Sequence, residues 1–479
     1  MRLSDFDVPN MVAIVSAQGT GSKLFQSLLD SHPQIYMIPA YPLMYFYPHW
    51  FEWIETLGSK ATWKKLIDLL CTKHASVIDS RKIKGHNGLT QLGPKQDEFV
   101  SIDEDLFRSY LEEILTEEII DSRSFLLAIH YAYSLCKNEP TNQKRILVYH
   151  IHACEFLAEY LLKDFPDVKV IATTRDPRPN FERRCRARRN VDQAKLNETD
   201  IRIYRSRIYE QYCQFASTEQ NRLKPIPNEN VKMIRHEDIG LKRTELMKDT
   251  SRFIGIDFLP TMLELTFDGK EWWGDSVYNM QPTNEINPTV ISLEWKNEID
   301  EIDWFVIEGL FYEYIIKYKY DPTFKYVEDT LINKIKLLLI ILIPSRIERE
   351  AFLEYVNPSK HWEFIKLAWA EASKKKPLHD YSWSATHLYK LSYRKFKLAS
   401  RIEEFIPGIH NPVESISDNP ISFLYKLIYV IVKYSRFLWS TISYPLQVVK
   451  RILILYTHFL KRIKHSNHYP DILGHSIEK

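Results

Sequence analysis

Two segments of this chain carry the side chains best suited to hold an anion. The first, residues 11–33, runs from an apolar stretch through Gly19 and Gly21 into the pattern of an amphipathic helix. Glycine lets the backbone turn tightly and expose its N–H groups, and the N-terminus of a helix attracts negative charge. The segment therefore predicts a phosphate pocket. Its expected residues are Gly19, Thr20, Gly21, Ser22, Lys23 and Leu24.

The second segment, residues 164–190, has a β-branched stretch that ends at Arg175 and is followed by a strongly basic sequence. A guanidinium binds phosphate through two parallel hydrogen bonds. Arg175 and Arg183 are therefore candidates to bind an anion. The other arginines face either an anionic acceptor or solvent. The whole cluster is Arg175, Arg178, Arg183, Arg184, Arg186, Arg188 and Arg189.

These two segments need a scaffold in which the ends of several strands meet. Short apolar or alternating stretches at residues 12–15, 144–156, 168–174 and 230–239 are typical of strands, and helical patterns separate them. Alternation of strands and helices predicts an α/β fold with a central parallel sheet. We expect a P-loop-like three-layer sandwich, with helices on both faces of the sheet and a helical C-terminal extension.

The glycine turn is not a Walker A sequence, because Leu24 stands where a hydroxyl residue would have to follow Lys23. The turn and its continuation, LFQSLLDSHP, resemble the loop and first helix of Golgi-type and bacterial sulfotransferases. The RDPR sequence at residues 175–178 is similar to the family's 3′-phosphate segment. The resemblance covers about residues 8–322. It implies a loop that holds the 5′-phosphosulfate of 3′-phosphoadenosine-5′-phosphosulfate (PAPS), with Arg175 on the 3′-phosphate.

Two positions depart from the family pattern. The family usually has Lys or Arg at the position of Gly19, and we expect Lys23, on the first helical turn, to supply the missing cation. The family has Ser at the position of Arg183, where a guanidinium can also bind the phosphate. With both positions altered, a catalytically inactive protein on the same fold remains an alternative.

A base is needed to take the proton of an acceptor hydroxyl, and imidazole titrates near neutral pH. His152 lies where cytosolic sulfotransferases carry their catalytic histidine, and His150 shares its face of the predicted strand. A structural histidine is the alternative for either residue. Golgi-type relatives use a glutamate after the first helix, which residues 38–40 lack. His32 and His49 are further candidates for the base.

Residues 266–279 resemble the loop that covers cofactor and acceptor in the family. Trp272 offers a flat surface for stacking, and Gly274 allows unusual backbone angles. Core packing is the alternative for one of the two tryptophans, Trp272 and Trp273. Residues 230–254 are expected to be scaffold, and a last helix near Trp304 to belong to the core.

A length of 479 residues predicts a catalytic unit with an appendage. We expect a catalytic domain at residues 1–325 with a helical insert at about 41–139 that shapes the acceptor cleft. A helical extension at 326–406, a linker at 407–420 and a basic amphipathic tail at 421–479 complete the chain. The stretch 419–470 has no acidic residue, so the tail suits an anionic membrane surface. A bundle packed on the catalytic domain is the alternative.

Composition limits the compartment and the partners. The five cysteines are scattered without metal-binding or disulfide spacing, and no signal-peptide pattern is visible, so we expect a cytoplasmic protein, peripheral on the membrane. A net charge of +2 gives no support for nucleic-acid binding. No apolar run reaches the length of a membrane-spanning helix.

These patterns favour a PAPS-dependent sulfotransferase that acts on a hydroxyl of a carbohydrate or glycolipid, with His152 as base and no metal. Lys23 would neutralise charge on the leaving phosphate. A P-loop nucleotide kinase is the alternative from another enzyme class, and it would require Mg²⁺ and ATP. A non-catalytic membrane-surface protein is the third reading.

Overall fold

The computed structural model describes residues 2–17, 19–40, 42–82, 88–152, 157–181, 223–274, 301–321 and 331–341, with scattered positions between 358 and 453 and residues 471–472. The chain divides into two compact units. Unit 1 comprises residues 1–175, 218–291 and 469–479, and unit 2 comprises residues 176–217 and 292–468.

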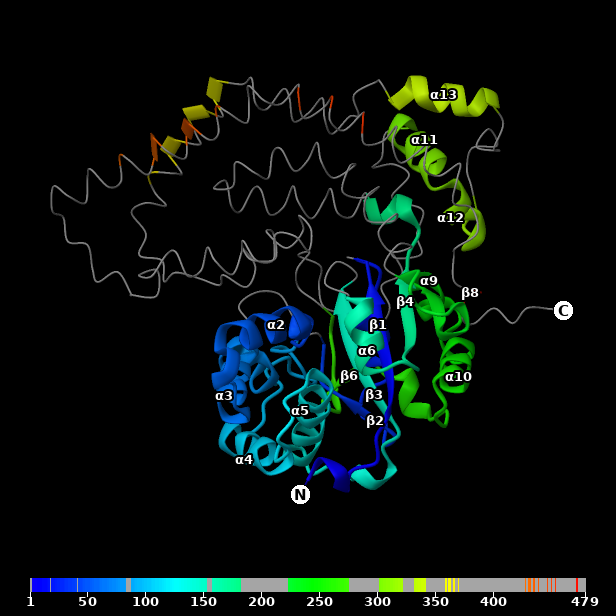
Figure 1. The fold of residues 1–479 in the computed structure, drawn as a ribbon. Coiled ribbons are helices and arrows are strands. Elements are labelled where there is room, and N and C mark those ends of the chain that lie inside the picture. Colours follow the sequence, from blue (N-terminus) through cyan, green and yellow to red (C-terminus); the bar gives the residue numbers. More distant parts are fainter. Residues whose placement is uncertain are drawn as a thin grey trace. The chain divides into compact units, whose positions relative to one another are not determined.

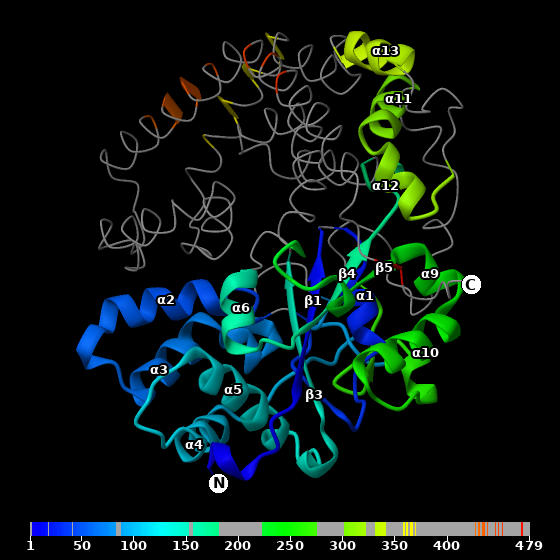
Figure 2. The same cartoon turned by 45° about the vertical axis from the view of Figure 1, so that its right-hand side comes forward.

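Unit 1 is built around a parallel sheet with the strand order β2-β3-β1-β4-β5-β8. The strands are β1 (Asn10–Ser16), β2 (Ile35–Met37), β3 (Ile146–His152), β4 (Lys169–Thr174), β5 (Val231–Arg235) and β8 (Asp471–Ile472). In both views of the fold, helices α2 to α5 lie together on one side of the sheet, and α9 and α10 lie on the other (Figures 1 and 2). The predicted α/β fold with a central parallel sheet is confirmed.

The central strands are buried because both of their faces are covered, which explains their continuous apolar sequence. Met11 to Val15 of β1 are each at most 3% exposed. Ser16, the last residue of β1, is in register with His152 of β3 and with Thr173 of β4. The carboxyl ends of three strands therefore meet at one edge of the sheet, where parallel α/β folds bind their ligands.

The helices of unit 1 include the predicted helical insert. They are α1 (Ser22–Ser27), α2 (Phe46–Leu57), α3 (Trp63–Lys73), α4 (Glu104–Ile114), α5 (Ser122–Cys136), α6 (Ala158–Asp164), α9 (His236–Leu241) and α10 (Arg243–Ile254). Short 3₁₀ turns lie at Leu3–Asp5, Gly58–Lys60, Ala75–Val77, Ser80–Lys82, Thr141–Gln143, Asn228–Asn230 and Pro260–Leu263. Thr62, Asp103 and Asp121 accept backbone N–H groups at the starts of α3, α4 and α5, as N-cap residues do.

Aromatic side chains join the insert into a core of its own. Phe46 and Trp50 of α2 pack against Phe125 of α5, with ring centroids 6.2 and 5.6 Å apart. The ring centroid of Tyr47, also in α2, lies 6.3 Å from that of Tyr149 in β3. The aromatic sequence after β2 thus fastens α2 to both α5 and the sheet.

The segment after α10 forms a two-stranded hairpin. Strands β6 (Thr266–Phe267) and β7 (Lys270–Glu271) are joined by Asp268 and Gly269, both with positive φ. The peptide group of Trp272, directly after β7, bonds to Leu265. This hairpin is the described part of the loop that the sequence predicts over cofactor and acceptor.

Unit 2 is described at residues 176–181, in three helices and at scattered helical positions. Helices α11 (Glu301–Leu310), α12 (Tyr312–Lys317) and α13 (Leu331–Ile341) follow one another along the chain. Ile307, in the predicted last helix, is 1% exposed, as expected for a core residue. The predicted linker at 407–420 lies outside the described residues, as does most of the tail.

Three details differ from the sequence interpretation. The predicted strand at residues 230–239 ends at Arg235, and His236–Leu241 form helix α9. The helix predicted after Gly21, whose apolar pattern continues through Leu28 and Leu29, ends at Ser27, so both leucines belong to the following turn. Asp471 and Ile472, assigned to the amphipathic tail, pair in parallel with Lys232 and Met233 of β5 and extend the sheet of unit 1. Within the described residues, no helix has the length and apolar character needed to cross a membrane.

Candidate functional site

The predicted phosphate turn connects β1 with α1 at the carboxyl edge of the sheet. Gly19 and Gly21 have φ angles of 82° and 83°. L-amino acids with a side chain rarely adopt this left-handed conformation. The sequence therefore needs glycine at both positions for the backbone to follow this path.

The side chain of Thr20 holds the turn to its surroundings. Its Oγ1 donates to the carbonyl oxygen of Ala17 at 2.7 Å and lies 2.7 Å from Oγ1 of Thr173 in β4. Because the Thr20 hydrogen goes to Ala17, the Thr173 hydroxyl is the donor in the second bond. The Thr20 hydroxyl thus fixes the turn to the neighbouring strand, a role that its sequence context did not indicate.

The first turn of α1 contains the other predicted loop residues. Ser22 and Lys23 are 7% and 5% exposed, and Leu24 is partly exposed. A lysine this buried is unusual and needs charge compensation. Lys23 is thus buried on the first turn of α1, and its role as the cation of the turn stays a prediction.

Arg175 follows β4 directly and is 4% exposed. Its Nη1 donates to the carbonyl oxygen of Gly19 at 3.4 Å, so the guanidinium lies beside the phosphate turn. Its buried Nε has no hydrogen-bond partner among the described residues. A buried charge with an unused donor is costly unless an anion completes it.

Two more buried polar atoms lie at the same edge of the sheet. The hydroxyl groups of Ser16, at the end of β1, and of Thr174, at the end of β4, have no partner in the described part of the chain. Ser16 is in register with Thr173, so Thr174, the next residue of β4, points to the opposite face of the sheet from Ser16. Of these unsatisfied groups the Arg175 guanidinium, which lies beside the turn, is the one that fits a phosphate.

The histidine candidates differ in their surroundings. His152 ends β3, but its side chain lies outside the described residues. His150 is 3% exposed, and its Nδ1 lies 2.6 Å from Oε1 of Gln26 in α1. His32 is bonded through Nε2 to the carbonyl oxygen of Asp257 at 2.9 Å. These contacts give His150 and His32 structural partners.

His49 is hydrogen-bonded to a second imidazole, that of His74. Nδ1 of His74 bonds to the carbonyl oxygen of Pro42 at 2.7 Å, and because a carbonyl only accepts, this nitrogen carries the hydrogen. Nε2 of His74 then accepts from Nδ1 of His49 at 3.0 Å. Burial lowers the pKa of His74 to about 4 and holds the pKa of His49 well below its ordinary value. His49 is thus a partly exposed, neutral imidazole held in one orientation.

The predicted covering loop is anchored by its tryptophans. Trp272 is 5% exposed and packs edge-on against Phe267, with centroids 5.2 Å apart. The indole N–H of Trp273 donates to the carbonyl oxygen of Gly93 at 2.7 Å. Gly274, with φ of 90°, follows them. The packing of Trp272 is that of a core residue, the alternative that the sequence left open for one of the two.

The arginine cluster separates into different environments. Arg183 and the arginines after it lie outside the described residues. The sequence predicted that Arg178 faces an anionic acceptor or solvent, and this prediction is wrong. Arg178 is 4% exposed and forms ion pairs within unit 2. Its Nη1 bonds to Glu308 at 2.6 Å and to the carbonyl oxygen of Asp321 at 2.8 Å, and its Nη2 to Asp176 at 2.7 Å. Arg178 is therefore a structural residue.

Sequence reasoning missed two residues that the fold brings into these networks. His236, the first residue of α9, lies against Gly21 of the phosphate turn. Glu308 is completely buried in α11, where it accepts from Arg178 and from the indole N–H of Trp304. Glu308 stands four residues after Trp304 in a helical pattern, and this spacing was the only signal for their contact.

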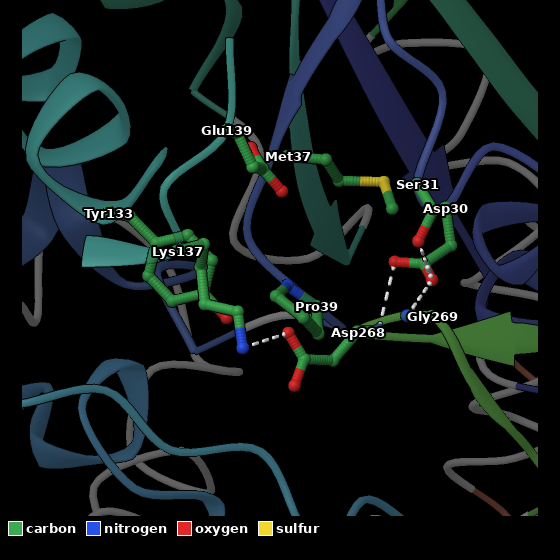
Figure 3. Close-up of a pocket in the computed structure, with 9 residues that line it drawn as sticks. All are labelled: Asp30, Ser31, Met37, Pro39, Tyr133, Lys137, Glu139, Asp268 and Gly269. Atoms are coloured by element: carbon green, nitrogen blue, oxygen red, sulfur yellow. Dashed lines mark hydrogen bonds and ion pairs between the residues drawn. The ribbon is translucent and has the colours of Figure 1, made fainter. Parts of the chain in front are cut away.

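A separate cavity of about 120 Å³ lies beyond the opposite end of α1 (Figure 3). Asp30, one of its lining residues, accepts hydrogen bonds from the backbone N–H groups of Gly269 at 2.9 Å and Asp268 at 3.1 Å. The Lys137 ammonium pairs with the Asp268 carboxylate at 2.6 Å. The cavity is lined by Asp30, Ser31, Met37, Pro39, Tyr133, Lys137, Glu139, Asp268 and Gly269. None of the predicted cofactor residues lines it.

No group of three or more His, Cys, Asp or Glu side chains placed to hold a metal ion occurs among the described residues. Cys71 and Cys136 are free thiols. Burial raises the pKa of both to about 11.

Comparisons with known proteins agree with the resemblance seen in the sequence. A family model described as the sulfotransferase family matches residues 9–260. A search of curated protein sequences gives no match. Among solved structures, the sulfotransferase domain from the curacin biosynthetic pathway is 17% identical, with a TM-score of 0.34 over 61% of this chain and 93% of that chain.

Two further solved structures are similar. A sulfotransferase from Mycobacterium avium is 14% identical, with a TM-score of 0.30 over 55% of this chain and 67% of that chain. The sulfotransferase domain of the Synechococcus olefin synthase is 12% identical, with a TM-score of 0.32 over 61% and 89%. Because the family model spans more than half of its residues, this chain belongs to the sulfotransferase family.

Proposed function

We propose that this protein transfers the sulfuryl group of PAPS to a hydroxyl of a carbohydrate or glycolipid. Membership of the family supports a transferase that uses this donor. The observation that carries the proposal is the Arg175 guanidinium, which is buried beside the glycine turn and whose Nε has no partner within the described part of the chain. A bound phosphate stabilises a buried cation of this kind, and the 3′-phosphate of PAPS is such a group.

Each part of the site has a distinct task in this scheme. The backbone N–H groups of residues 19–24 and the Lys23 ammonium would bind the 5′-phosphosulfate, and Arg175 with Arg183 would bind the 3′-phosphate. When bound, PAPS supplies an activated sulfuryl group whose bond to the phosphate oxygen breaks as the acceptor oxygen bonds to sulfur. Lys23 would stabilise the negative charge that this leaves on the phosphate.

The acceptor hydroxyl has to lose its proton as the new bond forms, and we assign this proton to a histidine. His152 is the residue expected from the sequence, at the strand end in register with Ser16. Positioning and charge stabilisation would supply most of the rate acceleration, as in phosphoryl transfer. The scheme needs no metal.

The acceptor and the compartment rest on features of the sequence. The aromatic segment after β2, expected to shape an acceptor cleft, does not support the sugar acceptor, because Phe46, Tyr47 and Trp50 are at most 5% exposed and pack in the core of the insert. The acid-free basic stretch 419–470 suits an anionic membrane surface, and the unpaired cysteine pattern suits the cytoplasm. We therefore propose a cytoplasmic enzyme that meets its acceptor at a membrane.

The test is calorimetric titration of the protein with 3′-phosphoadenosine 5′-phosphate, compared with ATP and Mg²⁺, and repeated on Arg175→Ala. We expect the bisphosphate to bind and Arg175→Ala to weaken binding by more than tenfold, about 1.4 kcal/mol. Arg243→Ala is the matched control, because this half-buried arginine of α10 bonds to the carbonyl oxygen of Leu263 and not to the phosphate turn.

A preference for ATP with Mg²⁺ would favour the nucleotide kinase instead. Bisphosphate binding without sulfuryl transfer to any member of a panel of mono- and oligosaccharides would favour the inactive membrane-surface protein. Equal losses for Arg175→Ala and Arg243→Ala would remove Arg175 from the cofactor site.

A further inference from the structure

The phosphate turn is contacted residue by residue from the ends of two neighbouring strands. Arg175, after β4, bonds to the Gly19 carbonyl oxygen, and Thr173 of β4 bonds to Thr20. The third contact comes from His236, directly after β5: a Cβ built on Gly21 would lie 2.0 Å from its Nδ1, 2.8 Å from its Cε1 and 3.1 Å from its Cγ. The imidazole therefore lies directly against the Cα of Gly21.

His236 is itself held in place. It is 5% exposed and begins α9 immediately after the last residue of β5. Arg235 and Asp238 flank it in sequence, with Nε and Oδ2 3.6 Å apart and both side chains largely buried. The residue thus lies between a strand end and a helix start that an ion pair connects, and its ring is buried.

We propose that His236 is a positioning residue of the sulfuryl-transfer site, whose imidazole holds Gly21 in the conformation that presents the turn's N–H groups to the 5′-phosphosulfate. Electrostatic stabilisation requires such groups to be fixed before the reaction begins. The inference rests on the proposed function.

The chain offers matched controls for both partners of this contact. Gly255 has φ of 84°, almost the same as Gly21, but a Cβ on Gly255 would meet nothing within 4 Å. Gly255→Ala therefore carries the same backbone strain as Gly21→Ala without the ring contact. His130 is 2% exposed and bonds to the Leu126 carbonyl oxygen in α5, so His130→Ala removes a buried histidine remote from the turn.

The experiment is a double-mutant cycle on the full chain, with affinity for 3′-phosphoadenosine 5′-phosphate measured by calorimetry. We expect His236→Ala to weaken binding about tenfold and Gly21→Ala about a hundredfold, because the added methyl group displaces the ring. In the double variant the methyl group enters the space left by the ring, so at least tenfold of the Gly21→Ala loss should return. Gly255→Ala and His130→Ala should remain within about twofold of wild type.

Thermal unfolding of each variant checks that binding is measured on folded protein. Wild-type affinity in His236→Ala, or an equal loss from Gly21→Ala in both backgrounds, would overturn the positioning role and leave the proposed function standing. If the wild-type chain itself fails to bind the bisphosphate, the proposed function falls, and the cofactor-positioning role falls with it.

Discussion

Two arginines three residues apart, Arg175 and Arg178, are equally buried at 4% exposure but have opposite surroundings. Arg178 bonds to two carboxylates and a backbone carbonyl. Burial alone lowers its pKa, but its bonds to Asp176 and Glu308 outweigh this effect and raise the pKa above the ordinary value. Among the described residues, Arg175 donates one long bond, to Gly19, and its Nε has no partner.

The difference separates a residue whose charge is matched within unit 2 from one whose charge, in our proposal, is matched by a bound phosphate. A buried charge in a finished protein is matched either by the protein itself or by what it binds. Arg178 is matched by the protein, so its removal should damage stability. The described residues do not match Arg175, so we expect its removal to weaken binding while stability stays nearly unchanged.

The largest expected effect is on the Arg178 network. Arg178→Ala leaves the completely buried Glu308 without its cation, and breaking a buried pair in this way costs about 3–5 kcal/mol of the free energy of unfolding. The measurement is denaturant unfolding followed by tryptophan fluorescence, since Trp304 donates to the same carboxylate.

The double variant Arg178→Met, Glu308→Leu removes both charges and keeps the volume filled. It should be more stable than Arg178→Ala, because no unpaired charge remains. An unfolding midpoint for Arg178→Ala equal to that of wild type would show that the pair contributes nothing, and the contrast with Arg175 would fail.

His74 is intermediate between the two arginines, because its buried ring is stable in the protein only in the neutral form. Burial lowers its pKa to about 4, although its bond to Pro42 acts in the opposite direction. The unfolded chain takes up a proton near pH 6.5, so the stability that neutral His74 contributes is present above this pH and is lost as the pH falls toward 4. Between pH 7 and pH 5 the loss is about 2 kcal/mol, measurable by urea unfolding at the two pH values.

His130 is the internal control for this pH dependence, since burial lowers its pKa to about 4 as well. His74→Gln should remove the His74 share of the slope and keep the share of His130. A variant with the full wild-type pH dependence would show that His74 is not neutral in the folded protein.

Much of the fold could be predicted because the pattern of each strand is local. The apolar stretch of β1 and the β-branched stretch of β4 are visible in the sequence, and both strands occur where expected. The pairing of Asp471 and Ile472 with β5 could not be predicted, because two residues carry no pattern and their partners are more than 200 positions away. The early end of α1 at Ser27 was also hidden, because Leu28 and Leu29 continue its apolar periodicity.

The site could be predicted only where the residue type itself signals its role. Glycines and arginines signal a phosphate site by their type, so Gly19, Gly21 and Arg175 were found together. The distinction between Arg175 and Arg178 depends on Glu308, which reaches Arg178 only through tertiary folding. His236 likewise has no local signal, because its contact with Gly21 joins residues that are 215 positions apart.

The smallest expected effect on stability is that of Arg175→Met, which keeps an aliphatic side chain in the same space. Because the described residues do not match the Arg175 charge, its removal should change the free energy of unfolding by less than about 1 kcal/mol. The variant is more stable than wild type if the desolvation cost of the guanidinium outweighs its 3.4 Å bond to Gly19. Wild type, by contrast, should gain stability on adding 3′-phosphoadenosine 5′-phosphate, because a ligand that binds only the folded state shifts the equilibrium. Thermal unfolding with and without the bisphosphate measures both quantities. A loss for Arg175→Met as large as that for Arg178→Ala would mean that Arg175 is already matched within the chain, and the distinction between the two arginines would disappear.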